Sequence, residues 1–180
     1  GILPATDSTV NLDPYADQLT MLTPDLFFGA EGPGDGQFLN PHGVAIAKNG
    51  EIYVADSHNH RIQHFTADGE FINAWGAYGS VDAGSAEPGF FNEPWGIAVG
   101  PDGSVYVADT WNYRIQKFNS QGKFLTMWGT SGASDAPTTF WGPRGIVVGQ
   151  DGKVFITDTG NNRVVIFDED GTYLSQFGIN

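Results

Sequence analysis

The chain has 180 residues, of which 40% are hydrophobic, and this size suits one domain with an apolar core. Its net charge is −13, and its eight lysines and arginines are spread singly along the chain. We therefore expect no nucleic-acid partner, because such binding depends on clustered basic groups that neutralise phosphates. The absence of cysteine excludes disulfides, and no apolar run is long enough to span a bilayer. We expect a soluble protein and leave its compartment open, an extracytoplasmic one included.

The N-terminal part differs in composition from the rest of the chain. Residues 1–17 are rich in Asp, Pro, Ser and Thr without an apolar period, which predicts a flexible leader. Residues 18–35 are more apolar, and the segment 25–29 resembles residues 71–76 and 124–129 farther along the chain. We therefore predict an extra strand near Leu26, followed by a linker.

Three near-copies of one segment follow, over residues 36–76, 89–129 and 140–178. In the first copy, β-branched and aromatic runs predict strands at residues 43–47, 51–56, 61–66 and 70–75. Asn-Gly, Asp-Gly or Gln-Gly pairs separate strands one and two, and strands three and four, as in tight hairpins. Four-stranded units at a spacing of about 40–50 residues predict an all-β fold, a β-propeller with three four-stranded blades.

The repeated pattern also resembles a known family. It reads Pro-x-Gly-[Ile/Val]-Ala-Val, then [Ile/Val]-Tyr-Val-Ala-Asp-[Ser/Thr]-x-Asn-x-Arg-Ile-Gln-x-Phe, then Phe-[Leu/Ile]-x-x-Trp-Gly, and it resembles the NHL repeat over about residues 36–178. The third copy departs from it at Thr157, Val165 and Phe177. The resemblance implies one blade per repeat, usually in a six-bladed ring, but it implies no single activity.

Three blades in a row would leave two apolar blade faces bare, and rings normally need at least four blades. We therefore expect half of a six-bladed ring, which a second copy of the chain completes as a homodimer.

One recurrent turn is expected to be structural. The Asp-[Ser/Thr]-x-Asn-x-Arg turn joins strands two and three of every copy, where the Asp can accept backbone N–H groups and the Arg can pair with a carboxylate or a carbonyl. A residue that every blade requires is more often architectural than catalytic. The residues concerned are Asp56, Arg61, Asp109, Arg114, Asp158 and Arg163.

Two sets of variable positions are candidates for ligand binding, because both fall on the loop-rich end of the blades. The middle residue of Pro-x-Gly should line the mouth of the central channel, and it is His42, Trp95 and Arg144. The free positions of the turn between strands two and three are His58, His60, Trp111 and Tyr113 in the first two copies. The alternatives are ordinary surface variation for the first set, and packing against the connectors for the second.

A metal site is a further hypothesis. His42 with His58 or His60 could supply the imidazoles that zinc favours, and the central channel could also take calcium. In Pro41-His42-Gly43 the chain resembles the peptidyl-hydroxyglycine lyases, whose histidine in this motif binds zinc, but Trp95 and Arg144 stand where further histidines would be needed.

Two functions remain open on this basis. The first is a non-catalytic binding or assembly module that takes a protein or small-molecule ligand on its loop-rich face. The alternative is a metal-dependent lyase or hydrolase centred on His42.

Overall fold

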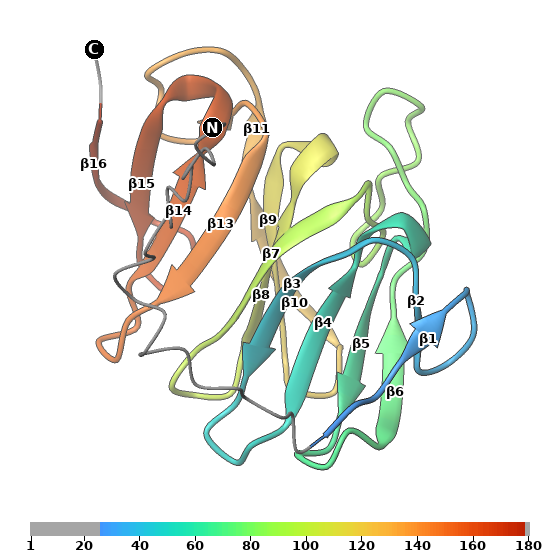
Figure 1. Cartoon of the computed structure of the whole chain (residues 1–180). Coiled ribbons are helices and arrows are strands. Elements are labelled where there is room, and N and C mark those ends of the chain that lie inside the picture. The colour runs from blue at the N-terminus through green and yellow to red at the C-terminus, as the bar shows by residue number, and fades with distance from the viewer. Residues whose placement is uncertain (1–25, 179–180) are drawn as a thin grey trace, which may run out of the picture.

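The computed structural model describes residues 26–178, and three four-stranded antiparallel sheets form the body of the fold. The sheets follow one another in chain order and stand side by side as an arc of blades (Figure 1). Blade 1 contains β3 (Pro41–Ile46), β4 (Ile52–Asp56), β5 (Arg61–Phe65) and β6 (Phe71–Trp75). Blade 2 contains β7 (Pro94–Val99), β8 (Val105–Asp109), β9 (Arg114–Phe118) and β10 (Phe124–Trp128). Blade 3 contains β13 (Pro143–Val148), β14 (Val154–Asp158), β15 (Arg163–Phe167) and β16 (Tyr173–Phe177). The three-bladed β-propeller architecture predicted from the repeats is thereby confirmed.

Shorter elements join the blades. Two-residue parallel pairs lie in the connectors before blades 1 and 3, formed by β1 (Ala30–Glu31) with β2 (Gln37–Phe38) and by β11 (Thr130–Ser131) with β12 (Thr139–Phe140). A parallel bridge between Tyr78 and Phe91 takes the same place before blade 2. One 3₁₀ turn joins strands two and three of each blade, namely η2 (Ser57–Asn59), η3 (Thr110–Asn112) and η4 (Thr159–Asn161). Within residues 26–178, no helix is long and apolar enough to cross a membrane.

Every blade has one hairpin end and one loop-rich end. The register pairs Ile46 with Ile52 and Phe65 with Phe71, so the glycine turns between these strands share the hairpin end. The glycines of these turns have positive φ, for example 88° at Gly50 and 82° at Gly122, as the hairpin prediction requires. The Pro-x-Gly entry, the 3₁₀ turn and the connector all meet at the opposite, loop-rich end.

The apolar cores lie between blades rather than inside one sheet. Tyr53 and Ile62 of blade 1 pack with Ile97 and Val107 of blade 2, and a second cluster in the same arrangement joins blades 2 and 3. A blade is therefore stable only beside a neighbour that covers its face. The two outermost faces of the described arc lack such a cover, and Val44 is 65% exposed where its equivalent Ile97 is 6% exposed.

The strand predicted near Leu26 is placed differently. Residues 26–29 form no strand. The strand of this segment is instead the two-residue β1 at Ala30–Glu31. The predicted leader at residues 1–17 lies outside the described residues.

Each connector begins with an aromatic anchor. The ring of Trp75 packs on Phe118 of the next blade with centroids 5.7 Å apart, and the ring of Trp128 packs on Phe167 at 5.8 Å. Phe28 packs in the same way on Phe65, at 5.1 Å. A Cβ atom on Gly122 would collide with Trp75, which explains why glycine occupies this turn beyond its positive φ. Residues 26–29 therefore match the end of a fourth blade strand in their packing, although they are not paired as a strand.

Candidate functional site

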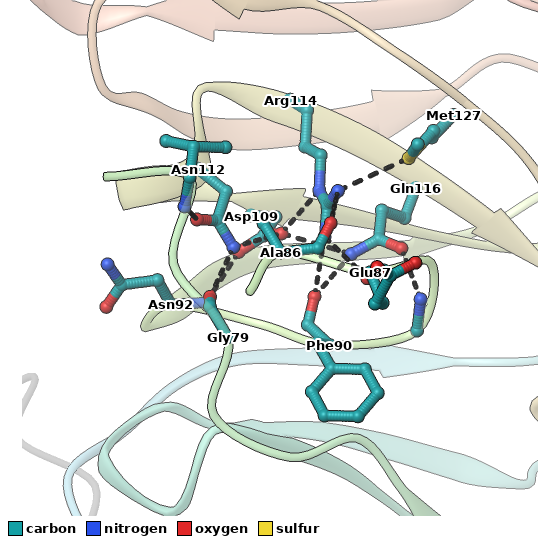
Figure 2. Close-up of polar contacts among 12 residues, drawn as sticks. Gly79, Ala86, Glu87, Phe90, Asn92, Asp109, Asn112, Arg114, Gln116 and Met127 are labelled. Carbon is teal, nitrogen blue, oxygen red and sulfur yellow. Dashed lines mark hydrogen bonds and ion pairs between the residues drawn. The ribbon is translucent and has the colours of Figure 1, made fainter. Parts of the chain in front are cut away.

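The recurrent turn is a buried hydrogen-bonded cluster, which is most complete in blade 2 (Figure 2). Asp109 Oδ1 accepts the backbone N–H of Asn92 at 2.8 Å. Its Oδ2 accepts from Asn112 Nδ2 at 2.9 Å, from Arg114 Nε at 2.8 Å and from Gln116 Nε2 at 3.0 Å. The carboxylate thus fixes the 3₁₀ turn and both strands that flank it.

The same cluster ties the connector to the blade. The Nη groups of Arg114 donate to the carbonyl oxygens of Ala86, Glu87 and Phe90, at 2.7, 3.1 and 2.8 Å (Figure 2). Asn112 Nδ2 donates to the carbonyl oxygen of Gly79 at 2.8 Å. These donors are all used within the protein, so none of them is free for a ligand.

Blades 1 and 3 repeat the pair with small changes. Arg61 Nε lies 2.8 Å from Asp56 Oδ2, and Arg163 Nε lies 2.9 Å from Asp158 Oδ2. Val165 replaces the glutamine of the other blades, and Gln176 of β16 instead accepts from Arg163 Nη1 at 2.9 Å. The structure therefore pairs the six residues that the sequence assigns to the repeat architecture, with one Asp–Arg pair in each blade.

Burial and charge act in opposite directions on the central carboxylate. Burial raises the pKa of Asp109, whereas the Arg114 guanidinium and the N–H groups of Asn92 and Asn112 act to lower it. A carboxylate that needs this many donors to remain charged is costly to bury without them. Its role in the geometry is to hold the fold.

The variable residues of Pro-x-Gly form a continuous stack across the three blades. The rings of His42 and Trp95 are 4.0 Å apart at 16°, and the guanidinium carbon of Arg144 lies 4.3 Å from the Trp95 ring. The stack forms because the inner strands β3, β7 and β13 approach closely. A Cβ atom on Gly43 would collide with the carbonyl oxygen of Trp95, and one on Gly96 with that of Arg144.

The two histidines of the first turn lie differently. His58 is exposed, and its Nε2 lies 3.2 Å from Asn40 Nδ2, which is also 3.3 Å from His42 Nε2. His60 is half-buried, and its Nδ1 accepts the backbone N–H of Glu93 at 3.2 Å. Burial is the largest effect on the pKa of His60 and lowers it, which favours the neutral ring. Only His58 of this pair therefore lies beside His42.

The aromatic residues of the second turn join a third ring that the sequence argument missed. Trp111 Nε1 donates to Glu93 Oε2 at 2.9 Å, and the Tyr113 ring stacks on Trp141 with centroids 5.8 Å apart at 22°. Trp141 covers Gly160, which has no side chain to displace it. With Arg144, these three rings line a hollow of about 150 Å³ between blades 2 and 3. The missed signal was the residue pair just before each Pro-x-Gly, where Trp141 and Glu93 stand.

The hypothesis of a metal centre has limited geometric support. His42 and His58 converge on Asn40, but His60 faces the connector, where its ring meets Tyr78 at 4.9 Å. Across residues 26–178, no group of three or more His, Asp or Glu side chains is placed to hold an ion. Two imidazoles alone are fewer than the protein ligands of a typical zinc site.

Comparison with known proteins supports a repeat family and a fold. The family model described as the NHL repeat matches residues 38–65, 91–118 and 140–167, one match per blade. Protein brain tumor of Drosophila melanogaster is 33% identical over 105 residues, which cover 58% of this chain and 10% of that protein. A probable peptidyl-alpha-hydroxyglycine alpha-amidating lyase of Caenorhabditis elegans, pgal-1, is 28% identical over 106 residues, covering 58% of this chain and 30% of that protein.

The solved structure of streptogramin B lyase has a similar fold. It aligns with a TM-score of 0.57 at 18% identity, and the alignment covers 77% of this chain and 40% of that one. The chain therefore spans well under half the length of these relatives. The repeat matches and the three blades together show that the chain belongs to the NHL-repeat family of β-propellers.

Proposed function

We propose that this chain is a non-catalytic NHL-type binding and assembly module, and that two copies close a six-bladed ring. The observation that carries the proposal is the aromatic anchor that each blade receives from the segment before it. Trp75 and Trp128 fill this role inside the arc, whereas Phe177, the equivalent residue of blade 3, is 57% exposed. The exposed anchor lacks only a blade to receive it.

The two outer faces of the arc carry the same kinds of apolar residue that pack against each other where neighbouring blades meet. Val44 and Ile46 of β3 are 65% and 69% exposed on one face, and Val147 of β13 is 63% exposed on the other. Their equivalents at the inner junctions are buried or half-buried. Because buried apolar area stabilises by roughly 25 cal/mol per Å², covering both faces favours association. A two-fold dimer covers both faces at once.

The solution mass tests this proposal. We expect twice the chain mass of 19.3 kDa by light scattering after size-exclusion chromatography. Val147→Glu places a charge on the proposed junction and is expected to give the monomer, while Lys48→Glu, at an exposed hairpin turn, is expected to keep the dimer. A wild-type chain that is a monomer at all concentrations tested would contradict ring closure.

The loop-rich end is the proposed binding surface. The stack of His42, Trp95 and Arg144 and the half-exposed rings of Trp111 and Trp141 stand there on rigid strands and short turns. Aromatic and arginine side chains at one surface are typical of recognition sites. The ligand is a protein segment or a small molecule, since the acidic charge of the chain disfavours nucleic acid.

A metal-dependent lyase remains the second candidate because His42 and His58 converge on Asn40 and because pgal-1 is among the relatives. Metal analysis of protein purified without chelators separates the two functions. One zinc per chain that is lost in His42→Ala, but kept in Lys48→Ala, would favour the lyase and contradict the non-catalytic module.

A further inference from the structure

Arg144 stands apart from the other arginines of the chain. Arg61, Arg114 and Arg163 each pair with the buried aspartate of their blade. Among residues 26–178, no carboxylate pairs with Arg144, and its buried Nε has no hydrogen-bond partner. In a chain with 21 acidic residues, an unpaired guanidinium that is held in place by stacking on Trp95 retains the capacity to pair with an external anion.

The hollow beside Arg144 is apolar apart from this cation. Its lining consists of Trp111, Tyr113, Trp141, Gly142, Arg144, Thr159 and Gly160. Trp111 is held by Glu93, and Trp141 is held between Tyr113 and Gly160, so the ring positions are already set. A cavity of about 150 Å³ is large enough for a benzene ring. The site therefore offers one apolar compartment and one positive charge at its edge.

We propose that this hollow binds a carboxylate carried next to one aromatic or branched apolar group. The proposal rests on the binding role of the loop-rich end and specifies its ligand. The rings of Trp111, Tyr113 and Trp141 would cover the apolar group, and the guanidinium of Arg144 would pair with the carboxylate. The Trp95 ring beneath the guanidinium limits its rotation, which reduces the entropy lost on binding.

A cationic ligand suits the site less well. Three aromatic rings alone resemble a cage for quaternary ammonium groups. However, the lining contains Arg144 and no Asp or Glu, and the neighbouring Glu93 carboxylate is already hydrogen-bonded to Trp111 Nε1, so a cation in the hollow would meet a like charge. The overall negative charge of the chain acts weakly at this range, because exposed charges are screened beyond about 8 Å at physiological salt.

The experiment compares N-acetyl-L-phenylalanine with N-acetyl-L-phenylalaninamide, which lacks only the carboxylate charge. Binding is followed through the tryptophan indole N–H signals in NMR titrations at physiological salt. Because a charge-assisted hydrogen bond contributes about 1.5–3 kcal/mol, the acid is expected to bind about tenfold tighter than the amide, or more. Equal affinities, or tighter binding of phenyltrimethylammonium, would overturn the proposal.

Three variants locate the effect. Arg144→Gln is expected to remove the difference between acid and amide. Lys48→Gln makes the same change in charge at the hairpin end and should leave the difference intact. Trp141→Ala is expected to weaken both probes. A preference for the acid that survives in Arg144→Gln would place the carboxylate elsewhere and contradict the assignment.

Two further readouts complete the design. A peptide C-terminus and a free aromatic acid share this chemistry, and 3-phenylpropionate distinguishes them. Equal binding of 3-phenylpropionate supports a free acid as the ligand, and weaker binding supports a C-terminus. The solution mass of each variant is measured in parallel. Failure of ring closure would appear in the mass alone, and failure of the ligand assignment would appear in the titrations alone.

Discussion

At the scale of single residues, the aspartate of the 3₁₀ turn combines complete burial with several hydrogen bonds. Asp109 is fully buried and accepts from the backbone of Asn92 and from the side chains of Asn112, Arg114 and Gln116. It is the point where the connector, the turn and two strands are held together. Its contribution is therefore to stability, and the variable residues above it remain free to differ between blades.

Replacement of this aspartate is expected to be severe. Asp109→Ala leaves the Arg114 guanidinium buried without its counter-charge, and breaking a buried ion pair in this way costs about 3–5 kcal/mol. Urea denaturation followed by tryptophan fluorescence measures the loss. Asp68→Ala, at an exposed hairpin turn, is the control and is expected to stay within about 0.5 kcal/mol of wild type. A loss below about 1 kcal/mol for Asp109→Ala would show that the cluster is not needed.

The sequence could predict the structural residues far better than the candidate site. Asp56, Arg61 and their equivalents recur in three copies, so their shared role was visible without coordinates. The sequence could place His42, Trp95 and Arg144 at the same end of the blades, but it could not predict that they stack. The stacking depends on how closely the inner strands approach one another. Trp141 was missed because its equivalents, Leu39 and Asn92, are not aromatic.

At the scale of elements, hydroxyl groups connect neighbouring blades. Ser57 Oγ of blade 1 donates to the carbonyl oxygen of Pro94, and Thr110 Oγ1 of blade 2 donates to that of Pro143, at 2.5 and 2.8 Å. Each bond joins the 3₁₀ turn of one blade to the first strand of the next. The serine or threonine that follows the turn aspartate thus has an inter-blade role in blades 1 and 2, which adds to the apolar packing between the sheets.

Removal of one such hydroxyl should weaken a single junction. Thr110→Val keeps the shape of the side chain but leaves the Pro143 carbonyl without this donor, and an unsatisfied buried acceptor costs about 1–3 kcal/mol. Thr138→Val is the control, because Thr138 makes the same change of side chain at an exposed position in the connector before blade 3. Urea denaturation of both variants measures the difference. Equal losses in the two variants would contradict an inter-blade role for the hydroxyl.

The strands themselves followed closely from the sequence. The predicted strands of the first copy agree with β3 to β6 within about two residues at each end, because aromatic and β-branched runs between glycine turns have few alternatives. The segment near Leu26 was the exception. Its pattern matches a fourth strand. However, a strand forms only where a neighbouring strand pairs with it, and the sequence of the segment alone does not reveal that neighbour.

At the scale of the whole molecule, the first anchor position is already filled. Phe28 lies on Phe65 and against Gly69, as Trp75 lies on Phe118 and against Gly122. If a second copy closes the ring, its Phe177 must reach the position that Phe28 holds. The chain's own Phe28 is then a competitor of assembly, and the two phenylalanines should have opposite effects on the dimer.

Two single substitutions test this competition. Phe28→Ala vacates the anchor position on Phe65 and is expected to tighten the dimer, because the incoming Phe177 no longer has to displace a ring. Phe177→Ala removes the incoming anchor and is expected to weaken the dimer. Burial of one phenylalanine is worth about 1.5–3 kcal/mol, so each junction should change its association constant by about tenfold or more.

Sedimentation across a dilution series measures both dimer constants. Leu125→Ala, which alters a half-exposed side chain on β10 of blade 2, is the control for a general loss of apolar surface. If Phe28→Ala weakened the dimer as much as Phe177→Ala, Phe28 would be part of the junction rather than its competitor. Blade 1 would then use the segment before it as a permanent cover, and Phe177 would need a different receptor from the one that Trp75 and Trp128 use.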